Sequence, residues 1–189
     1  MKTFLTALFL LAVSVAGFTQ SKLPPLDTSP LDVAYFPENY PLLRIQHKAT
    51  DPLLARVIYS RPQKNNRTIF GGLIEYGKVW RLGANEASEV EFFQNVKIGN
   101  VKVKKGRYTL YAIPSASTWT MILNRENDIW GSYAYDPKKD VVRMDLPVQK
   151  QTDISEAFGI VLEKINGGFN LSALWDDVKV SLPVSLQPL

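Results

Sequence analysis

A short run of polar residues beside an indole is the part of the sequence best suited to binding a ligand. Trp80, Arg81, Asn85 and Glu86 lie close together, at the apparent end of a strand and in the loop that follows it. An arginine fork, an amide and a carboxylate next to an aromatic face can hold a polar ligand by paired hydrogen bonds and stacking. This combination suits a sugar or a small carboxylated molecule.

The same cluster also has a structural interpretation. Arg81 and Glu86 could pair with each other, and Asn85 could hold the loop by bonding to its own backbone. Both uses are common, but loops at strand ends are also where binding sites are usually built. The sequence leaves both interpretations open, and the deciding observation is whether the segment lines a cavity or is packed under other strands.

Arg61 is the remaining candidate binding residue. Together with Arg56, Arg67 and Arg81 it could form an electropositive cleft for a phosphate or a carboxylate. Sequence spacing does not show that these side chains converge. Arg61 shares a strand face with Tyr59, so its stem could equally cover apolar surface.

An enzymatic function would depend on acidic residues, since glycoside hydrolysis needs two carboxylates about 5 to 10 Å apart. Glu89 and Glu91 alternate with apolar residues, as on the solvated face of a strand. Glu86 lies outside that pattern and is the candidate acid or base. No residue can be assigned as catalytic from the sequence, and whether the protein is an enzyme stays open.

His47 is the only histidine, which excludes a multi-histidine metal site. It alternates with Leu43 and Ile45, and this spacing predicts a histidine at the edge of the core. We expect neither a metal nor a cofactor.

Aromatic residues offer a further way to bind carbohydrate. A stacking platform could be formed by Trp119, Trp130, Tyr133, Tyr135 and Trp175. Aromatic side chains of a β domain more often fill the core, so the pattern also fits a purely structural role.

Strands must position all of these residues. Apolar and polar residues alternate at 118–123 and at 178–182, and turn residues recur about every ten positions. Gly99-Asn100 and 166–168 suit tight hairpins, and a short helix is suggested at 153–157 by a capping pattern. These signals predict an all-β fold, a single antiparallel β-sandwich or jelly-roll-like domain over residues 42–189.

The N-terminus predicts export. Lys2 precedes an apolar run at 4–15 that is too short to span a bilayer, and small residues follow at the spacing of a cleavage site, preferably after Thr19. We therefore expect a signal peptide at 1–19 and a periplasmic or extracellular location. Residues 20–41 contain five prolines, which favour an extended leader before the domain.

Composition excludes several classes of protein. There is no cysteine, so disulfides and a lipid-modified cysteine are ruled out. The formal net charge of +4 is too mild to indicate a nucleic-acid partner. No apolar run after the signal peptide is long enough to span a membrane. A small molecule or a carbohydrate is the expected partner, and the oligomeric state is left undetermined.

Several segments together resemble the domain of unknown function 2911 family of exported bacterial proteins. They are VIYSRP at 57–62, RTIFGGL at 67–73, YGKVWRLGANEA at 76–87, GRYTLYAIP at 106–114, and Trp119-Thr120, Asn124 and Trp130-Gly131. The sequence departs from the family pattern at Asn66 and Glu75. The resemblance implies an exported β domain, and it carries over no activity and no catalytic residue.

Three functions are consistent with these observations. The first is a non-enzymatic exported domain that binds a polar small molecule or glycan near Trp80, Arg81, Asn85 and Glu86. The second is a hydrolase of envelope glycans that uses Glu86. The third is a structural or interaction module.

Overall fold

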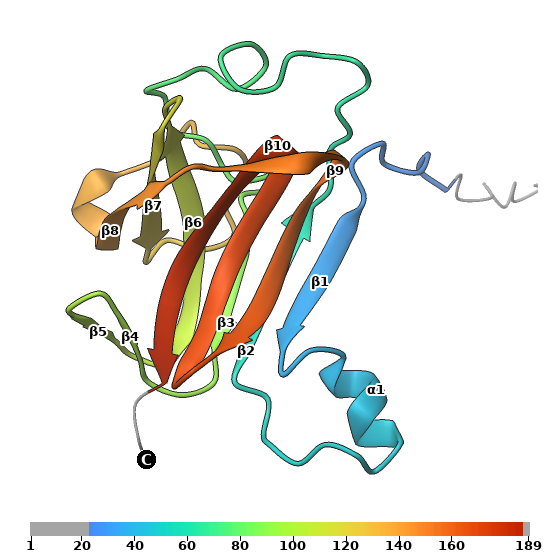
Figure 1. Ribbon diagram of the computed structural model, residues 1–189, viewed down its shortest axis with the longest axis vertical. Coiled ribbons are helices and arrows are strands. Elements are labelled where there is room, and N and C mark those ends of the chain that lie inside the picture. Colours follow the sequence, from blue (N-terminus) through green and yellow to red (C-terminus); the bar gives the residue numbers. More distant parts are fainter. Residues whose placement is uncertain (1–22, 187–189) are drawn as a thin grey trace, which may run out of the picture.

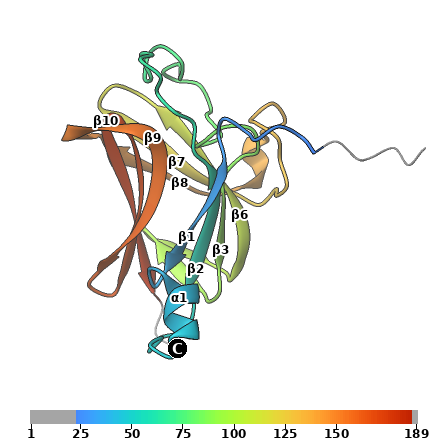
Figure 2. The same ribbon diagram turned by 90° about the vertical axis from the view of Figure 1, so that its right-hand side faces the viewer.

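Two antiparallel sheets face each other in the computed structural model, which describes residues 23–186 (Figures 1 and 2). The six-stranded sheet has the order β1-β2-β3-β6-β7-β8, and the four-stranded sheet has the order β5-β4-β10-β9. The predicted all-β sandwich is therefore confirmed. The predicted signal peptide lies outside the described residues, and no helix among residues 23–186 is long and apolar enough to cross a membrane.

The elements have the following bounds. The strands are β1 (Leu31–Phe36), β2 (Ala55–Ser60), β3 (Glu89–Phe92), β4 (Val96–Ile98), β5 (Val101–Val103), β6 (Gly106–Pro114), β7 (Thr118–Asn124), β8 (Asp140–Pro147), β9 (Gln149–Ile165) and β10 (Gly168–Leu186); α1 (Tyr40–Ile45) and the 3-10 helix η1 (Pro137–Lys139) are the helical segments.

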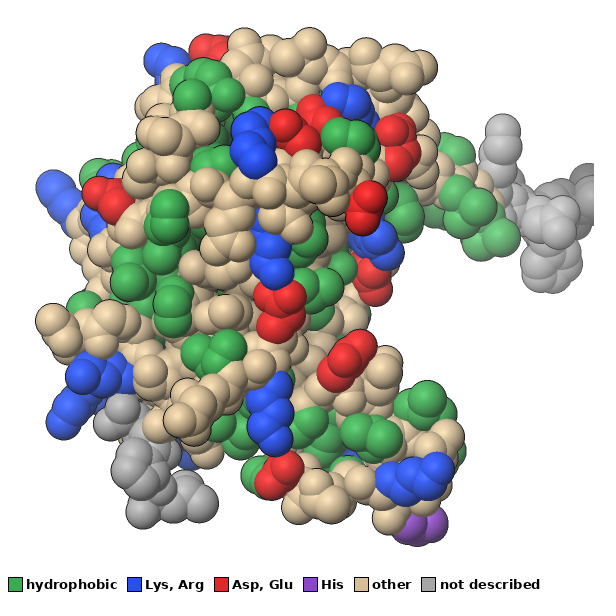
Figure 3. Space-filling view, viewed as in Figure 1, with side chains coloured by type: hydrophobic (Ala, Val, Ile, Leu, Met, Phe, Trp, Pro, Cys, Tyr) green, Lys and Arg blue, Asp and Glu red, His purple; other side chains and the backbone are tan. Residues whose placement is uncertain are grey.

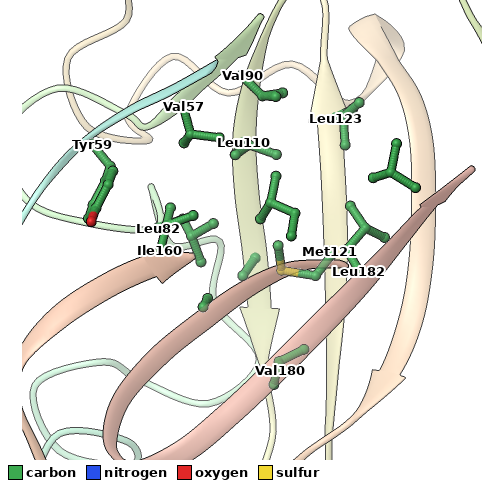
Figure 4. Packing of buried hydrophobic residues seen from close by; sticks show 14 of the residues in the cluster. Val57, Tyr59, Leu82, Val90, Leu110, Met121, Leu123, Ile160, Val180 and Leu182 are labelled. Atoms are coloured by element: carbon green, nitrogen blue, oxygen red, sulfur yellow. The ribbon is translucent and has the colours of Figure 1, made fainter. Parts of the chain in front are cut away.

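Alternation of apolar residues builds the core between the sheets. On β7, Met121 and Leu123 are fully buried, and on β10 Val180 and Leu182 are fully buried. Figure 4 shows these side chains between the two sheets. The strand pattern in the sequence therefore identifies which face of each strand points inward.

Two tight turns occur where glycine and asparagine predict them. Gly99 has φ of 55° in the turn between Ile98 and Val101, and Gly167 has φ of 72° in the turn between Ile165 and Gly168. Glycine adopts a positive φ at little cost, which lets the chain reverse over two residues.

Strand β10 bends back on itself, so that its two halves lie side by side. Asp176, with φ of 55°, lies at a break in the pairing with β9. Beyond it the chain returns beside its first half, since the hydroxyl of Ser172 lies 2.8 Å from that of Ser181 and the amide of Leu186 donates to the carbonyl of Gly167. Figure 1 shows the two halves side by side. The sheet is thus wider than its four strand labels suggest.

The N-terminal segment is part of the sheet. β1 lies within residues 20–41, which were expected to form a leader ahead of the domain, and it pairs with β2 along its whole length. The expected extended backbone is present, but as an edge strand. Pro30 and Pro37 flank the strand rather than interrupt it, so all six residues between them keep their amide groups.

Two local predictions are wrong. Residues 153–157 belong to strand β9 and form no helix, because pairing with β10 overrides the capping pattern. His47 is exposed, with φ of 55°, just after α1. The segment that was expected to be a strand turns into a short helix with no buried residue, so His47 does not reach the core.

Candidate functional site

Trp80 points into the core, and this corrects its expected role as a stacking surface. Its side chain is 6% exposed, and its indole N–H donates to the carbonyl of Gly83. The ring contacts an aromatic group made up of Phe70, Trp119, Phe158 and Trp175, at centroid distances of 5.3 to 6.1 Å. Its indole face is therefore not available to a ligand.

Arg61 bonds to residues of both sheets. Its guanidinium pairs with Asp32 at 3.0 Å, and its Nε donates to the carbonyl of Phe158 at 3.2 Å. Both partners lie at the junction between the two sheets. Arg61 thus joins β1 to β9, and its hydrogen bonds are to these two strands.

Arg81 follows Trp80 and is only partly buried. Within residues 23–186 its buried Nε has no hydrogen-bond partner, and none of the ion pairs found there joins Arg81 to Glu86. The structural interpretation in which these two side chains neutralise each other is thus not seen. A buried donor without a partner costs roughly 1–3 kcal/mol.

Asn85 and Glu86 are held by the loop between β7 and β8. Glu86 forms an isolated antiparallel bridge with Trp130, and the amide of Gly131 donates to the carbonyl of Asn85 at 2.9 Å. The backbone of Asn85 is left-handed, with φ of 56°, and its side-chain amide donates to Asp27 at 2.7 Å. The Glu86 side chain is exposed.

This pairing brings two exposed aromatic residues beside the candidate residues. Trp130 is 60% exposed and Tyr133 is 87% exposed. A Cβ built on Gly131 would lie 2.8 Å from the Tyr133 ring and 3.5 Å from Nη1 of Arg81, so ring and guanidinium approach the same point. We call Arg81, Asn85, Glu86, Trp130 and Tyr133 the aromatic–polar surface.

The aromatic–polar surface lies on the outer side of the six-stranded sheet. Beneath it, Tyr111 and Ile122 form a small second core with Ala87, covered in part by Tyr135. Figure 2 shows the loop before β8 on the side of that sheet away from β9 and β10. The loops that carry the surface are therefore packed onto the sheet.

Two tyrosines beneath this surface have raised pKa values. Burial raises the pKa of Tyr111 to about 12, and the negative charges of Glu126 and Asp140 add to the effect. Burial also raises the pKa of Tyr135 to about 12, helped by the hydrogen bond of 2.6 Å to Asp140. Both hydroxyls therefore keep their protons in the folded protein at a pH where an unfolded tyrosine, with a pKa of about 10, loses its proton.

This difference predicts a loss of stability at high pH. Between about pH 10 and pH 12 the unfolded chain releases phenolic protons first, so the free energy of unfolding should fall as the pH rises. In Tyr111→Phe the fall should be shallower, because one shifted group is gone. Urea denaturation at several pH values measures the slope. Tyr133→Phe, which removes an exposed hydroxyl, is the control, and an equal slope in wild type and Tyr111→Phe would contradict the prediction.

The acidic residues near the surface are largely paired. Glu89 accepts from the amide of Asp128 at 2.6 Å, and Arg107 lies 3.3 Å from Glu89 and 2.7 Å from Asp128. Glu91 pairs with Arg56 at 2.5 Å. Among residues 23–186 no group of three His, Cys, Asp or Glu side chains could hold a metal ion.

A groove lies elsewhere in the described part of the chain. It has a volume of about 1070 Å³ and runs between β1 and β9, at the edges of the two sheets. Figure 3 shows this face of the molecule, on which the lobe that carries α1 stands out from the main body. None of the five candidate binding residues lines this groove. Sequence analysis missed it because the β1 strand was not expected to belong to the domain.

Comparison with known proteins gives one match. A family model described as "Protein of unknown function (DUF2911)" matches residues 44–184. No curated protein and no solved structure matches the chain.

Proposed function

This chain belongs to the DUF2911 family of proteins of unknown function, and we propose that it binds a polar small molecule or glycan at the aromatic–polar surface. The chain acts as a binding domain. We further propose that it is exported, because of the signal peptide expected at residues 1–19, and meets its ligand in the periplasm or outside the cell.

The exposure of Trp130 and Tyr133 beside Arg81 carries this proposal. Tryptophan and tyrosine bury large areas when they can, so two such side chains 60% and 87% exposed in one loop leave a substantial apolar area in water. A sugar ring has apolar faces and polar edges. It would cover the aromatic rings while its hydroxyls reach Arg81 and Glu86.

Arg81 gives the surface its polar specificity. Its guanidinium is partly buried and pairs with none of the carboxylates within residues 23–186, so a ligand would meet a cation that no carboxylate neutralises. Charge-assisted hydrogen bonds from such a group are stronger than those between neutral partners. A ligand with vicinal hydroxyls or a carboxylate fits this planar donor.

Hydrolysis by Glu86 is the weaker alternative. It would need a second carboxylate about 5 to 10 Å away that is free to act. The neighbouring acids are engaged, since Asp27 accepts from Asn85, and Glu89 accepts from Asp128 and pairs with Arg107. This arrangement favours binding over catalysis.

We expect Arg81→Ala and Tyr133→Ala to weaken ligand binding by about tenfold or more each while the protein stays folded. A tenfold change corresponds to about 1.4 kcal/mol, the scale of one charge-assisted hydrogen bond or one stacked ring. The test screens neutral mono- and disaccharides, uronic acids and small carboxylates by isothermal titration calorimetry, and follows hits by tryptophan fluorescence.

Lys102→Ala is the matched control, because Lys102 is an exposed cation on the β4–β5 hairpin of the other sheet. Binding that is unchanged in Arg81→Ala, Glu86→Ala and Tyr133→Ala would show that the site is elsewhere. Turnover of a glycan by wild type that is abolished in a folded Glu86→Gln would instead establish the hydrolase.

A further inference from the structure

The groove between the sheets is bordered by the edges of two strands. Successive residues of each strand line it, Val33 to Phe36 on β1 and Ile160 to Ile165 on β9. Side chains of a strand alternate between faces, so a groove over a sheet face would be lined by every second residue. Lining by consecutive residues shows that the backbone edges themselves face the groove.

β1 turns unpaired backbone groups toward the groove. Among the described strands it pairs with β2 alone, and the carbonyls of Pro30 and Phe36 accept from Arg61 and Leu54 on the β2 side. Backbone direction alternates along an antiparallel strand, so the even-numbered residues face β2. The backbone groups of Val33 and Tyr35 then face the free edge. The amide of Val33 is satisfied by the side chain of Asp32, and that of Tyr35 has no such partner among the described residues.

β9 turns its even-numbered residues toward the same groove. At its upper part, the amide of Phe158 donates to Pro62 and the carbonyl of Glu156 accepts from Lys64. Alternation places the backbone groups of Ile160, Leu162 and Lys164 on this same edge, beyond the reach of residues 62–64. The backbone of Ile160 is hydrogen-bonded to the Tyr59 hydroxyl, so the open groups are those of Leu162 and Lys164. The chain therefore already pairs an extended segment with the upper part of this edge, and the lower part is left open.

We propose that the groove binds an extended peptide, which adds a strand along β9 in continuation of residues 62–64 and faces the free edge of β1. Main-chain hydrogen bonds supply affinity in this mode of recognition, and side-chain pockets supply specificity. An acyl chain fits less well. It would strip water from the open amides and carbonyls without replacing their hydrogen bonds, which costs about 1–3 kcal/mol for each group.

The walls of the groove define the preferred peptide. Ala34, Phe36, Leu54, Leu162 and Leu186 give it an apolar floor, which suits valine, isoleucine or leucine at alternate positions. The upper end is closed where Asp32 accepts from the Tyr59 hydroxyl and Arg61.

Charge defines the other end of the groove. The exposed acids Glu38 and Asp51 line the groove with Phe36, away from the Tyr59 end. Neither acid takes part in an ion pair found among residues 23–186. A lysine or arginine at that end of the peptide would complement them.

Capped peptides of alternating valine and threonine, about eight residues long, test the proposal, since six residues of β9 span about 20 Å. One carries a lysine at its first position and the other at its last. We expect one of them to bind by calorimetry and to slow amide hydrogen exchange at Leu162 and Lys164. N-methylation of alternate peptide amides should weaken binding by about tenfold or more, because it removes donors.

Two changes in the protein separate backbone from side-chain effects. Tyr35→Pro removes an amide that the β2 pairing does not use, and an edge strand tolerates proline there. It should weaken binding about tenfold relative to the matched Tyr35→Ala, which keeps the amide. The exposed pair Glu38→Lys and Asp51→Lys, combined in one protein, should reverse the preference from the lysine peptide to a glutamate peptide without changing the fold.

Three results would overturn the proposal. They are the absence of binding and of amide protection with both peptides, equal binding of the N-methylated peptides, and binding of palmitate in place of the peptides. Protection that rises with protein concentration alone would identify a second copy of the chain as the occupant instead. The groove shares no residue with the aromatic–polar surface, so none of these outcomes bears on glycan binding.

Discussion

Trp80→Ala should lower the free energy of unfolding by about 3–5 kcal/mol, the cost of removing a large aromatic side chain from a packed core. Trp80 packs between both sheets, 5.3 Å from the ring of Phe158 on β9 and 5.7 Å from that of Trp119 on β7. Its indole N–H also satisfies the carbonyl of Gly83, which the variant leaves unpaired. Urea denaturation followed by circular dichroism measures the change.

Trp130→Ala is the matched control. Trp130 is 60% exposed, so its loss should change the free energy of unfolding by no more than about 0.5 kcal/mol. The same variant should weaken a ligand of the aromatic–polar surface. Equal destabilisation by the two substitutions would contradict the assignment of Trp80 to the core and Trp130 to the surface.

Gly168→Ala should prevent stable folding. A Cβ on Gly168 would lie 2.0 Å from the carbonyl oxygen of Val184 and 3.0 Å from the Cα of Ser185. These are backbone atoms within the same folded-back strand, so no side-chain rotation relieves the clash. We expect a loss of about 4 kcal/mol or more, which is exceptional for one substitution, and a corresponding drop in soluble yield and Tm.

Gly159→Ala tests whether the effect is due to the clash rather than to the loss of a glycine. Gly159 lies on β9 and pairs with Leu174, and a Cβ there would meet nothing within 4 Å. It should leave the protein as stable as wild type or slightly more stable, since alanine restricts the unfolded chain. A Gly168→Ala protein as stable as Gly159→Ala would show that the two halves of β10 do not lie this close.

The sequence predicts local strands well because alternation is a local signal. It could also have separated Trp80 from Arg81, since neighbouring residues of a strand point to opposite faces. Assigning both to one site assumed that side chains close in sequence also point the same way in space. Arg81 and Glu86 remain together on the outer side, where loop pairing and not strand periodicity places them.

Other parts of the candidate site depend on contacts between distant segments. The bridge between Glu86 and Trp130 brings together residues that no local pattern relates. The aromatic pattern named Trp130 and Tyr133 as members of a platform, but it also named Trp119 and Trp175, which are 1% exposed. Exposure depends on which loops cover a residue, and the sequence does not contain that information locally.

The groove was missed for a similar reason. Five prolines in residues 20–41 dominate the composition of that window and hide a six-residue strand between two of them. Strand β1 is recognised from its pairing with β2 in the structure. The groove is recognised from the free edge of β1.

Strand β1 also bears on where the unit of folding begins. The family match starts at residue 44, after β1 and most of α1, yet β1 covers β2 along its whole length. A recombinant domain trimmed to the matched residues would expose β2 as a new sheet edge. It would also lack the β1 wall of the groove, which includes Tyr35. Such an uncovered edge invites pairing between molecules. For this protein, the segment matched by the family model is thus shorter than the segment that makes the sheet complete.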